Sequence, residues 1–224
     1  MGIRSRRQFS IILAVVLAAF HAQTLAQSSS SSRPKSVQSQ AAPTDAGSVV
    51  NGLYRNASFG FTCKIPFGWV DRTQQMSDDS TEETASNSNS ATKKSLLFLA
   101  VFERPPEVAG DAVNSTILVA AEPASYYPGL QNAAQYFGPL TELTKSKGLK
   151  VVNEPYEYPV DAKQLVRGDF SKPLGNLTLH QSTLVLMEKG YLVSFTFIGG
   201  TEDEVDDLVE GLKFARKESS PPAQ

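Results

Sequence analysis

The feature that most constrains the fold is a pair of long strand-like segments separated by a tight turn. Residues Leu177 to Met187 and Tyr191 to Gly199 are rich in β-branched and aromatic side chains, and Glu188-Lys189-Gly190 separates them. In the second segment the apolar odd-numbered residues from Tyr191 to Phe197 share one face. Two such segments joined by a short turn that ends in Gly predict a β-hairpin, and therefore an antiparallel sheet.

Four further segments extend this sheet. Leu96 to Phe102 (LLFLAVF) and Thr116 to Ala121 are continuous apolar runs, which is typical of strands covered on both faces. Residues 149–158 and 164–170 also have the composition of strands. A sheet with so many apolar strands needs other elements to cover its faces.

Two segments have helical periodicity. In Glu202 to Lys213 the apolar residues recur at helical spacing, and Thr201 and Glu204 have the spacing of a capping box. The second helix is predicted from Leu130 to Lys147, with a break or kink at Gly138-Pro139. The pattern predicts an α+β fold, a mostly antiparallel β-sheet covered by helices in an α/β/α sandwich.

The N-terminal segment has the features of an export signal. Three arginines between residues 4 and 7 precede the apolar run Ile11 to Phe20, and Thr24-Leu25-Ala26 provides a cleavage site after Ala26. Residues 5–9 (SRRQF) also resemble the twin-arginine motif, so both export routes stay open. The expected location is periplasmic or extracellular, without a stable membrane span in the mature chain, because the apolar run is short.

Composition divides the rest of the chain. Residues 27–47 are rich in Ser and Gln and are expected to form a disordered tether after the signal peptide, residues 1–26. A single domain is predicted over residues 48–215, interrupted by a mobile polar loop at 77–94. Residues 216–224 are expected to form a disordered tail.

The charge and the rare residues exclude several functions. The net charge is -2, which does not fit nucleic-acid binding. One Cys excludes an internal disulfide framework and a metal site built from cysteines, and there are only two His. Neither a metal nor a cofactor site is predicted.

Several short motifs resemble those of PsbP-like domains, the family of PsbP- and Mog-type sandwiches. They are Tyr54–Asn56, Phe59–Phe61, Ile65–Trp69, Val166–Phe170, Tyr191–Phe197 and Leu212–Phe214. The structural landmarks that the sequence predicts are Phe59, Phe61, Cys63, Pro66, Gly68, Trp69 and Phe214. The long polar insert at 77–94 departs from the compact family pattern.

The resemblance implies a fold and a broad kind of role. PsbP proteins are extrinsic, non-catalytic subunits that dock on photosystem II, other relatives bind a small GTPase, and bacterial relatives are exported envelope proteins. Family members are mostly binding or assembly factors. No metal-ligand residues of the photosystem members can be matched here.

Three groups of residues are candidates for chemistry. Cys63 alternates with Phe61 and Ile65, which predicts a buried structural thiol and not a nucleophile. His180 shares a strand face with Ser182, but without a nucleophile elbow the pair is expected on a solvated polar face. The acidic residues from Glu202 to Glu210 favour a helix N-terminus more than a Ca²⁺ site.

The leading hypothesis is therefore an exported, non-enzymatic binding or accessory protein of the bacterial cell envelope. Its partner is expected to be an envelope protein, and exposed aromatic residues at Tyr126 and Tyr127 form a candidate interaction surface. The alternative is a carrier of a small apolar ligand or lipid, which requires a cavity. A hydrolase is the third hypothesis.

Overall fold

The structure is a computed structural model that describes residues 45–78 and 95–215. The predicted signal peptide, the C-terminal tail, and most of the tether and polar loop lie outside the described residues. The first two residues assigned to that loop, Ser77 and Asp78, belong to a helical stretch at residues 73–78. The prediction of a loop from residue 77 was therefore wrong for these two residues.

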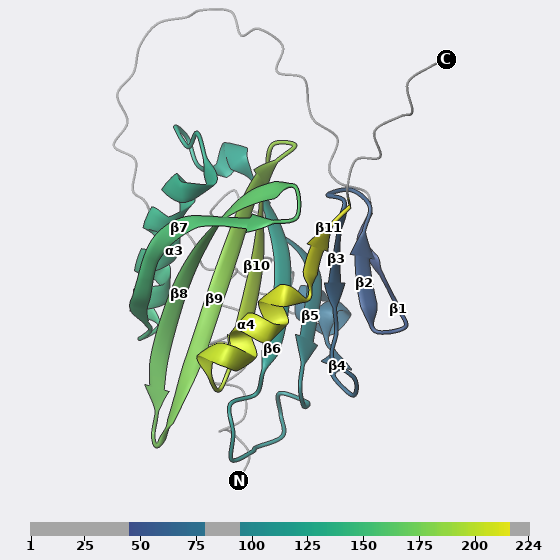
Figure 1. The fold of residues 1–224 in the computed structure, drawn as a ribbon, viewed down its shortest axis with the longest axis vertical. Coiled ribbons are helices and arrows are strands. Elements are labelled where there is room, and N and C mark those ends of the chain that lie inside the picture. Colours follow the sequence, from purple (N-terminus) through teal and green to yellow (C-terminus); the bar gives the residue numbers. More distant parts are fainter. Residues whose placement is uncertain (1–44, 79–94, 216–224) are drawn as a thin grey trace, which may run out of the picture.

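A seven-stranded antiparallel sheet forms the centre of the molecule (Figure 1). Its strands lie in the order β4-β5-β6-β10-β9-β8-β7. Their bounds are Val70–Asp71 (β4), Leu96–Phe102 (β5), Thr116–Pro123 (β6), Lys150–Val160 (β7), Lys163–Leu174 (β8), Leu177–Glu188 (β9) and Tyr191–Gly199 (β10). The predicted class, a mostly antiparallel α+β fold, is confirmed.

A smaller sheet joins strands from the two ends of the described chain. Its order is β1-β2-β3-β11, with β1 at Ser48–Val50, β2 at Leu53–Asn56, β3 at Phe61–Lys64 and β11 at Leu212–Phe214. The inner face of this sheet carries buried side chains such as Phe61 and Cys63, and the outer face is exposed. Figure 1 shows these four strands beside the large sheet.

The two faces of the large sheet bury separate cores. One core contains Phe195 and Phe197 of β10 and packs against the small sheet and against helix α4, Glu202–Glu210. The other contains Phe170 and Val185 and packs against helix α3, Ala133–Ser146. A short 3-10 helix, η1, at Ala124–Tyr126 connects β6 toward α3. The molecule is thus layered, with the large sheet in the middle.

The hairpin of β9 and β10 forms as the sequence predicts. Lys189 and Gly190 form its turn, and both have positive φ angles, 52° and 77°. This backbone matches the two-residue turns that follow the right-handed twist of the flanking strands.

Helix α3 is continuous, so the prediction of a break at Gly138-Pro139 was wrong, while the alternative of a kink stays a prediction. The helix runs through Pro139, and Asn132 caps its first turn by accepting a hydrogen bond from the Gln135 backbone. One of the clashes by which a proline ring disfavours helical backbone is with the Cβ of the preceding residue, and Gly138 has none. Burial of Tyr136, Phe137 and Leu140 against the sheet stabilises the remaining helix.

Helix α4 starts where the capping box predicts but ends earlier. Thr201 Oγ1 accepts a hydrogen bond from the Glu204 backbone at 3.1 Å. The helix ends at Glu210, whereas a longer helix to Lys213 was expected. Leu212 and Phe214 instead form the inner face of β11, because strand pairing with Cys63 and Phe61 buries both side chains.

Candidate partner-binding groove

A polar groove of about 380 Å³ lies between helix α4 and strands β7, β8 and β9. Its floor is the face of the large sheet that carries Arg167, Asp169 and Ser182. Val152, Tyr156 and Tyr158 of β7 line one wall, and Glu202, Asp206 and Glu210 of α4 line the other. We name this site the α4 groove.

Arg167 is the centre of the groove. The residue is 8% exposed, and its guanidinium donates hydrogen bonds to Asp169 Oδ1 at 2.8 Å, Ser182 Oγ at 2.8 Å and Asp206 Oδ1 at 2.5 Å. The guanidinium carbon also lies 5.1 Å from the centre of the Tyr158 ring, within cation–π range. Three bonds to three elements fix the side chain and join α4 to the sheet.

Both carboxylate oxygens of Asp169 accept hydrogen bonds. Its Oδ1 accepts from Arg167 and from the Ser182 hydroxyl, and its Oδ2 accepts from Asn153 Nδ2 at 3.1 Å and Tyr156 Oη at 3.2 Å. Burial alone would raise the pKa of Asp169, but the bonds from Ser182 and Arg167 outweigh it and hold the pKa below its ordinary value. Asp169 is therefore a stable carboxylate at neutral pH.

The Asp169 carboxylate affects the pKa values of two neighbouring side chains, Tyr156 and Arg167. Burial and the nearby Asp169 carboxylate raise the pKa of Tyr156 to about 12. Burial would lower the pKa of Arg167, but its hydrogen bonds with Asp169 and Asp206 raise it above the ordinary value. Both side chains keep their neutral-pH protonation states, so the groove has a fixed pattern of charge and donors.

Ser182 and His180 do not form a catalytic pair. The Ser182 hydroxyl is 2% exposed and donates to Asp169, while His180 Nδ1 lies 3.6 Å from Glu202 Oε1. The expectation of a solvated polar face was wrong for Ser182, because α4 covers this part of the sheet. Two acidic residues of α4 accept hydrogen bonds from different partners. Asp206 accepts one from Arg167, and Glu204 accepts one from the backbone of Gly200, just before the helix.

The other sequence landmarks lie in the core. Phe59, Phe61, Cys63 and Phe214 are buried in the core beneath the small sheet, and Trp69 packs partly buried against it. Pro66 and Gly68 form the turn after β3, where Gly68 has a φ angle of 86°. Burial raises the pKa of the Cys63 thiol to about 12, which makes it a poor nucleophile.

Tyr126 and Tyr127, which were expected to form an exposed surface, differ in their burial. Tyr126 is half-buried, and Tyr127 is 8% exposed, so the expectation that both are exposed was wrong for Tyr127. The Tyr127 and Tyr136 hydroxyls both donate to Glu122 Oε2, and their rings pack edge-to-face at 5.0 Å. These contacts join the segment before α3 to the helix.

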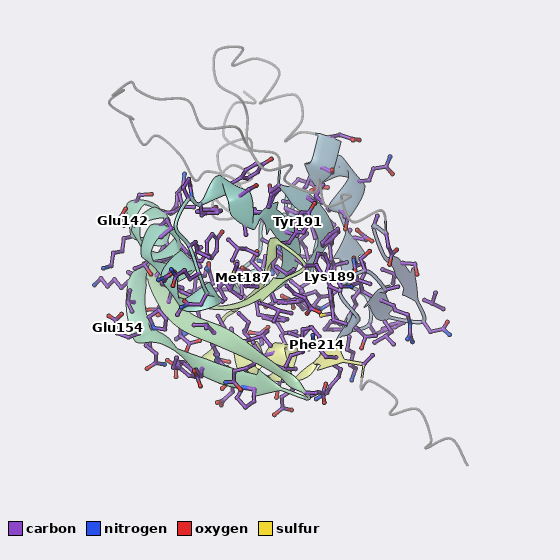
Figure 2. The ribbon with its side chains drawn as sticks, turned by 90° about the horizontal axis from the view of Figure 1, so that it is seen from above. Glu142, Glu154, Met187, Lys189, Tyr191 and Phe214 are labelled. Carbon is purple, nitrogen blue, oxygen red and sulfur yellow. The ribbon has the colours of Figure 1, made fainter. Side chains whose placement is uncertain are left out.

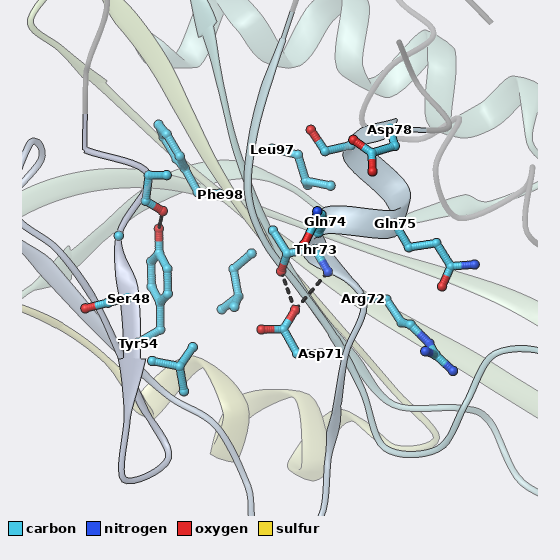
Figure 3. Close-up of a pocket in the computed structure, with 15 residues that line it drawn as sticks. Ser48, Tyr54, Asp71, Arg72, Thr73, Gln74, Gln75, Asp78, Leu97 and Phe98 are labelled. Carbon is cyan, nitrogen blue, oxygen red and sulfur yellow. Dashed lines mark hydrogen bonds between the residues drawn. The ribbon is translucent and has the colours of Figure 1, made fainter. Parts of the chain in front are cut away.

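A second cavity, of about 900 Å³, lies between β1 and β5 (Figure 3). Tyr54, Phe98 and Leu97 contribute apolar surface, and Asp71, Gln74 and Gln75 contribute polar surface. Tyr54 donates a hydrogen bond to the Ala46 carbonyl at 2.9 Å, and Asp71 accepts two from Thr73. The mixed lining differs from the apolar pocket that a lipid carrier requires.

Sequence reasoning missed the Arg167 network. Arg167 and Asp169 are an oppositely charged pair two residues apart on a predicted strand, which places them on one face. This charged pair was the feature of the sequence that could have indicated the network. The contributions of Ser182 and Asp206 depend on strand register and on the docking of α4.

Among the described residues, no three His, Cys, Asp or Glu side chains are grouped so that they would hold a metal ion. Within residues 45–78 and 95–215, no helix combines the length and apolarity needed to cross a membrane.

No family model and no curated protein matches the sequence. Solved structures do match the fold. The cyanobacterial PsbP of Synechocystis sp. PCC 6803 has 12% identity and a TM-score of 0.45 over 75% of this chain and 95% of its own. The Ran-binding protein Mog1p of Saccharomyces cerevisiae has 12% identity and a TM-score of 0.42 over 75% and 96%.

A third similar structure is LpqN of Mycobacterium tuberculosis, a protein involved in cell envelope biogenesis. It has 11% identity and a TM-score of 0.38 over 70% of this chain and 83% of its own. The three structures are thus similar to this chain at 11–12% identity and with TM-scores below 0.5. At these identities the likeness concerns the fold alone.

Proposed function

We propose that the protein is an exported, non-enzymatic binding or accessory protein of the cell envelope, and that the α4 groove binds its partner. Export is inferred from residues 1–26, with cleavage after Ala26 and a periplasmic or extracellular location. Residues 48–215 are proposed to form the single binding domain. N-terminal sequencing of the protein from its host tests the cleavage site.

The observation that supports binding is the preorganised centre of the groove. Arg167, Asp169 and Ser182 bond one another, and each residue is at most 8% exposed. This burial supports a positioning role for the three side chains over direct contact with a reacting substrate. A fixed surface of this kind serves recognition, because little entropy is lost on binding.

The charge of the groove indicates the chemistry of the partner. Its lining has four carboxylates, Asp169, Glu202, Asp206 and Glu210, and one guanidinium, Arg167, which gives -4 + 1 = -3 with His180 neutral. The rings of Tyr156 and Tyr158 add aromatic surface, and Tyr156 is 39% exposed. A protein segment that carries Lys or Arg fits this combination.

A photo-crosslinking experiment tests the groove. A photoreactive phenylalanine analogue at position 156 should crosslink the partner in the host envelope. The added substitutions Glu202→Lys and Glu210→Lys should abolish the crosslink by repelling a cationic segment. The matched control is Glu142→Lys on the exposed face of α3. If the groove substitutions and the control leave the crosslink equally strong, with unchanged melting temperatures, the groove is excluded as the binding site.

The carrier of a small apolar ligand or lipid remains the second candidate. The volume of the cavity beside Phe98 and Leu97, about 900 Å³, is the observation that favours it, whereas the mixed lining counts against a wholly apolar ligand. Native mass spectrometry of protein purified gently from its host distinguishes the candidates. A bound small mass supports the carrier, whereas a larger complex supports the accessory protein.

A further inference from the structure

The outer face of the small sheet combines positive charge with exposed apolar side chains. Outward-facing positions in its strands include the exposed side chains of Arg55, Lys64 and Lys213. None of these three cations forms an ion pair with a described residue, although the whole protein has a net charge of -2. The positive charge is therefore concentrated locally.

Strand register brings these cations together. Lys213 of β11 is opposite Thr62, and Thr62 is opposite Arg55. Lys64 lies two residues beyond Thr62 on the same face, opposite Leu53. Since neighbouring strands are about 5 Å apart, the three cations occupy one small patch.

The four strands contain no acidic residue. The flanking acids Asp45 and Asp161 accept hydrogen bonds from backbone N–H groups, which fixes the position of each carboxylate without removing its charge. Asp45 accepts hydrogen bonds from the backbones of Gly47 and Ala57, and Asp161 accepts one from the backbone of Phe214. The nearest carboxylate of α4 is that of Glu210, which precedes Gly211, and the Gly211 carbonyl accepts a hydrogen bond from the Lys64 backbone, so this acid borders the patch on one side.

Phe67 lies at one end of the small sheet. It is fully exposed, at 105% of the reference area, in the turn after β3. Ile65 N donates to Gly52 O at 2.7 Å, which holds this turn against the β1-β2 hairpin, where Val50 is 63% exposed. Two exposed apolar side chains thus lie at the end of the sheet where Lys64 ends β3.

We propose that the outer face of the small sheet docks on an anionic lipid surface. The cations would lie against lipid phosphates, and Phe67 and Val50 would enter the boundary between headgroups and acyl chains. A lipid surface fits both components, because it offers a plane of negative charge with apolar material beneath it. This inference goes beyond the proposed partner binding and uses none of the groove residues.

The arrangement also fixes the orientation on the surface. The acidic residues of α4 would be repelled by the lipid, so only the small sheet faces it. The α4 groove would then stay accessible to a partner while the protein is docked. Figure 1 shows α4 leading directly into β11 of the small sheet, with β1 and β2 farther from the helix, and Figure 2 labels Phe214 of β11.

Vesicle co-sedimentation of the processed, exported protein tests the proposal. The protein should bind vesicles that contain phosphatidylglycerol, bind pure phosphatidylcholine weakly, and dissociate at high salt. The triple variant Arg55→Gln/Lys64→Gln/Lys213→Gln should lose about fivefold per cation, on the order of hundredfold in all. Phe67→Ser should lose about tenfold.

Two matched controls separate this patch from net charge and general apolarity. Lys145→Gln/Lys147→Gln/Lys150→Gln removes the same charge near α3, and Val108→Ser removes another exposed apolar side chain. Both controls should bind vesicles like the unaltered protein. Equal losses in patch and control variants, or no binding by the unaltered protein, would overturn the proposal. Patch-dependent binding to an acidic protein and not to vesicles would likewise reject it.

Discussion

The thiol of Cys63 points into the core beneath the small sheet and is 0% exposed. Burial raises its pKa to about 12, so the reactive thiolate is almost absent at neutral pH. We expect no reaction with a disulfide reagent in the native protein and one thiol equivalent after unfolding in guanidinium. Rapid labelling of the native protein would contradict both the burial and the structural role.

Asp169 makes stability depend on pH in a defined direction. Its folded pKa lies below the unfolded value of about 3.9, so its stabilising effect is complete above that value and is lost as pH falls through the folded pKa. We expect Asp169→Asn to lower the free energy of unfolding by about 2 kcal/mol at neutral pH. The loss should shrink in acid.

Urea unfolding between pH 7 and pH 3 measures this effect. Asp207→Asn is the control, since Asp207 is an exposed acid on α4. It should change stability by less than about 0.5 kcal/mol. A difference between Asp169→Asn and the unaltered protein that stays constant down to the lowest pH would contradict the assigned ionisation.

At the scale of elements, α3 packs on β8 through a glycine. A Cβ on Gly168 would lie 2.6 Å from Phe137 Cε1, so the ring occupies the space of a side chain. We expect Gly168→Ala to cost about 1–3 kcal/mol of stability. Phe137→Leu should cost less in that background than alone, because the two sites are coupled.

The control for this prediction lies in the same helix. Apart from its two neighbours in the chain, a Cβ on Gly138 would have no atom within 4 Å, and the residue lacks a positive φ angle. Only the ring of Pro139 would meet the added methyl group, so Gly138→Ala should cost less stability than Gly168→Ala. Chemical denaturation of the three variants provides the comparison, and a harmless Gly168→Ala would show that α3 packs differently.

Elements were predictable where local signals agree with packing. The hairpin followed from alternation and Lys189-Gly190, and the start of α4 followed from Thr201 and Glu204. The break at Pro139 was a wrong prediction, because the loss of one hydrogen bond was weighed without the burial of Tyr136 and Phe137. Leu212 fits the apolar face of a helix and the inner face of a strand equally well. Only the pairing of this segment with β3 decides between the two structures.

The candidate groove was less predictable than the fold. Its centre joins Arg167 of β8, Ser182 of β9 and Asp206 of α4, and no local pattern specifies that these residues meet. Their contact depends on strand register and on where α4 docks. The sequence indicated only the charged pair on β8 and the polar face of β9.

At the scale of the whole molecule, β11 closes the small sheet against β3. Phe214 packs against Phe61 and Phe195, with ring centres 6.1 Å and 6.0 Å apart. We expect Phe214→Ala to cost about 3–5 kcal/mol of stability, measured by urea unfolding. The neighbouring Lys213→Ala, on the exposed face, should cost less than about 0.5 kcal/mol. Similar costs for both would mean that β11 is not docked in the sheet.

The pairing of β3 with β11 has a consequence for biosynthesis. The ribosome makes β3 early and β11 only after the entire large sheet and both α3 and α4. Until then the aromatic inner face of β1 to β3 lacks its final neighbour, and contacts between such distant segments form slowly. We therefore expect the nascent chain to remain incompletely folded throughout translation. That delay would give a chaperone or translocation channel time to engage the polypeptide before its structure closes.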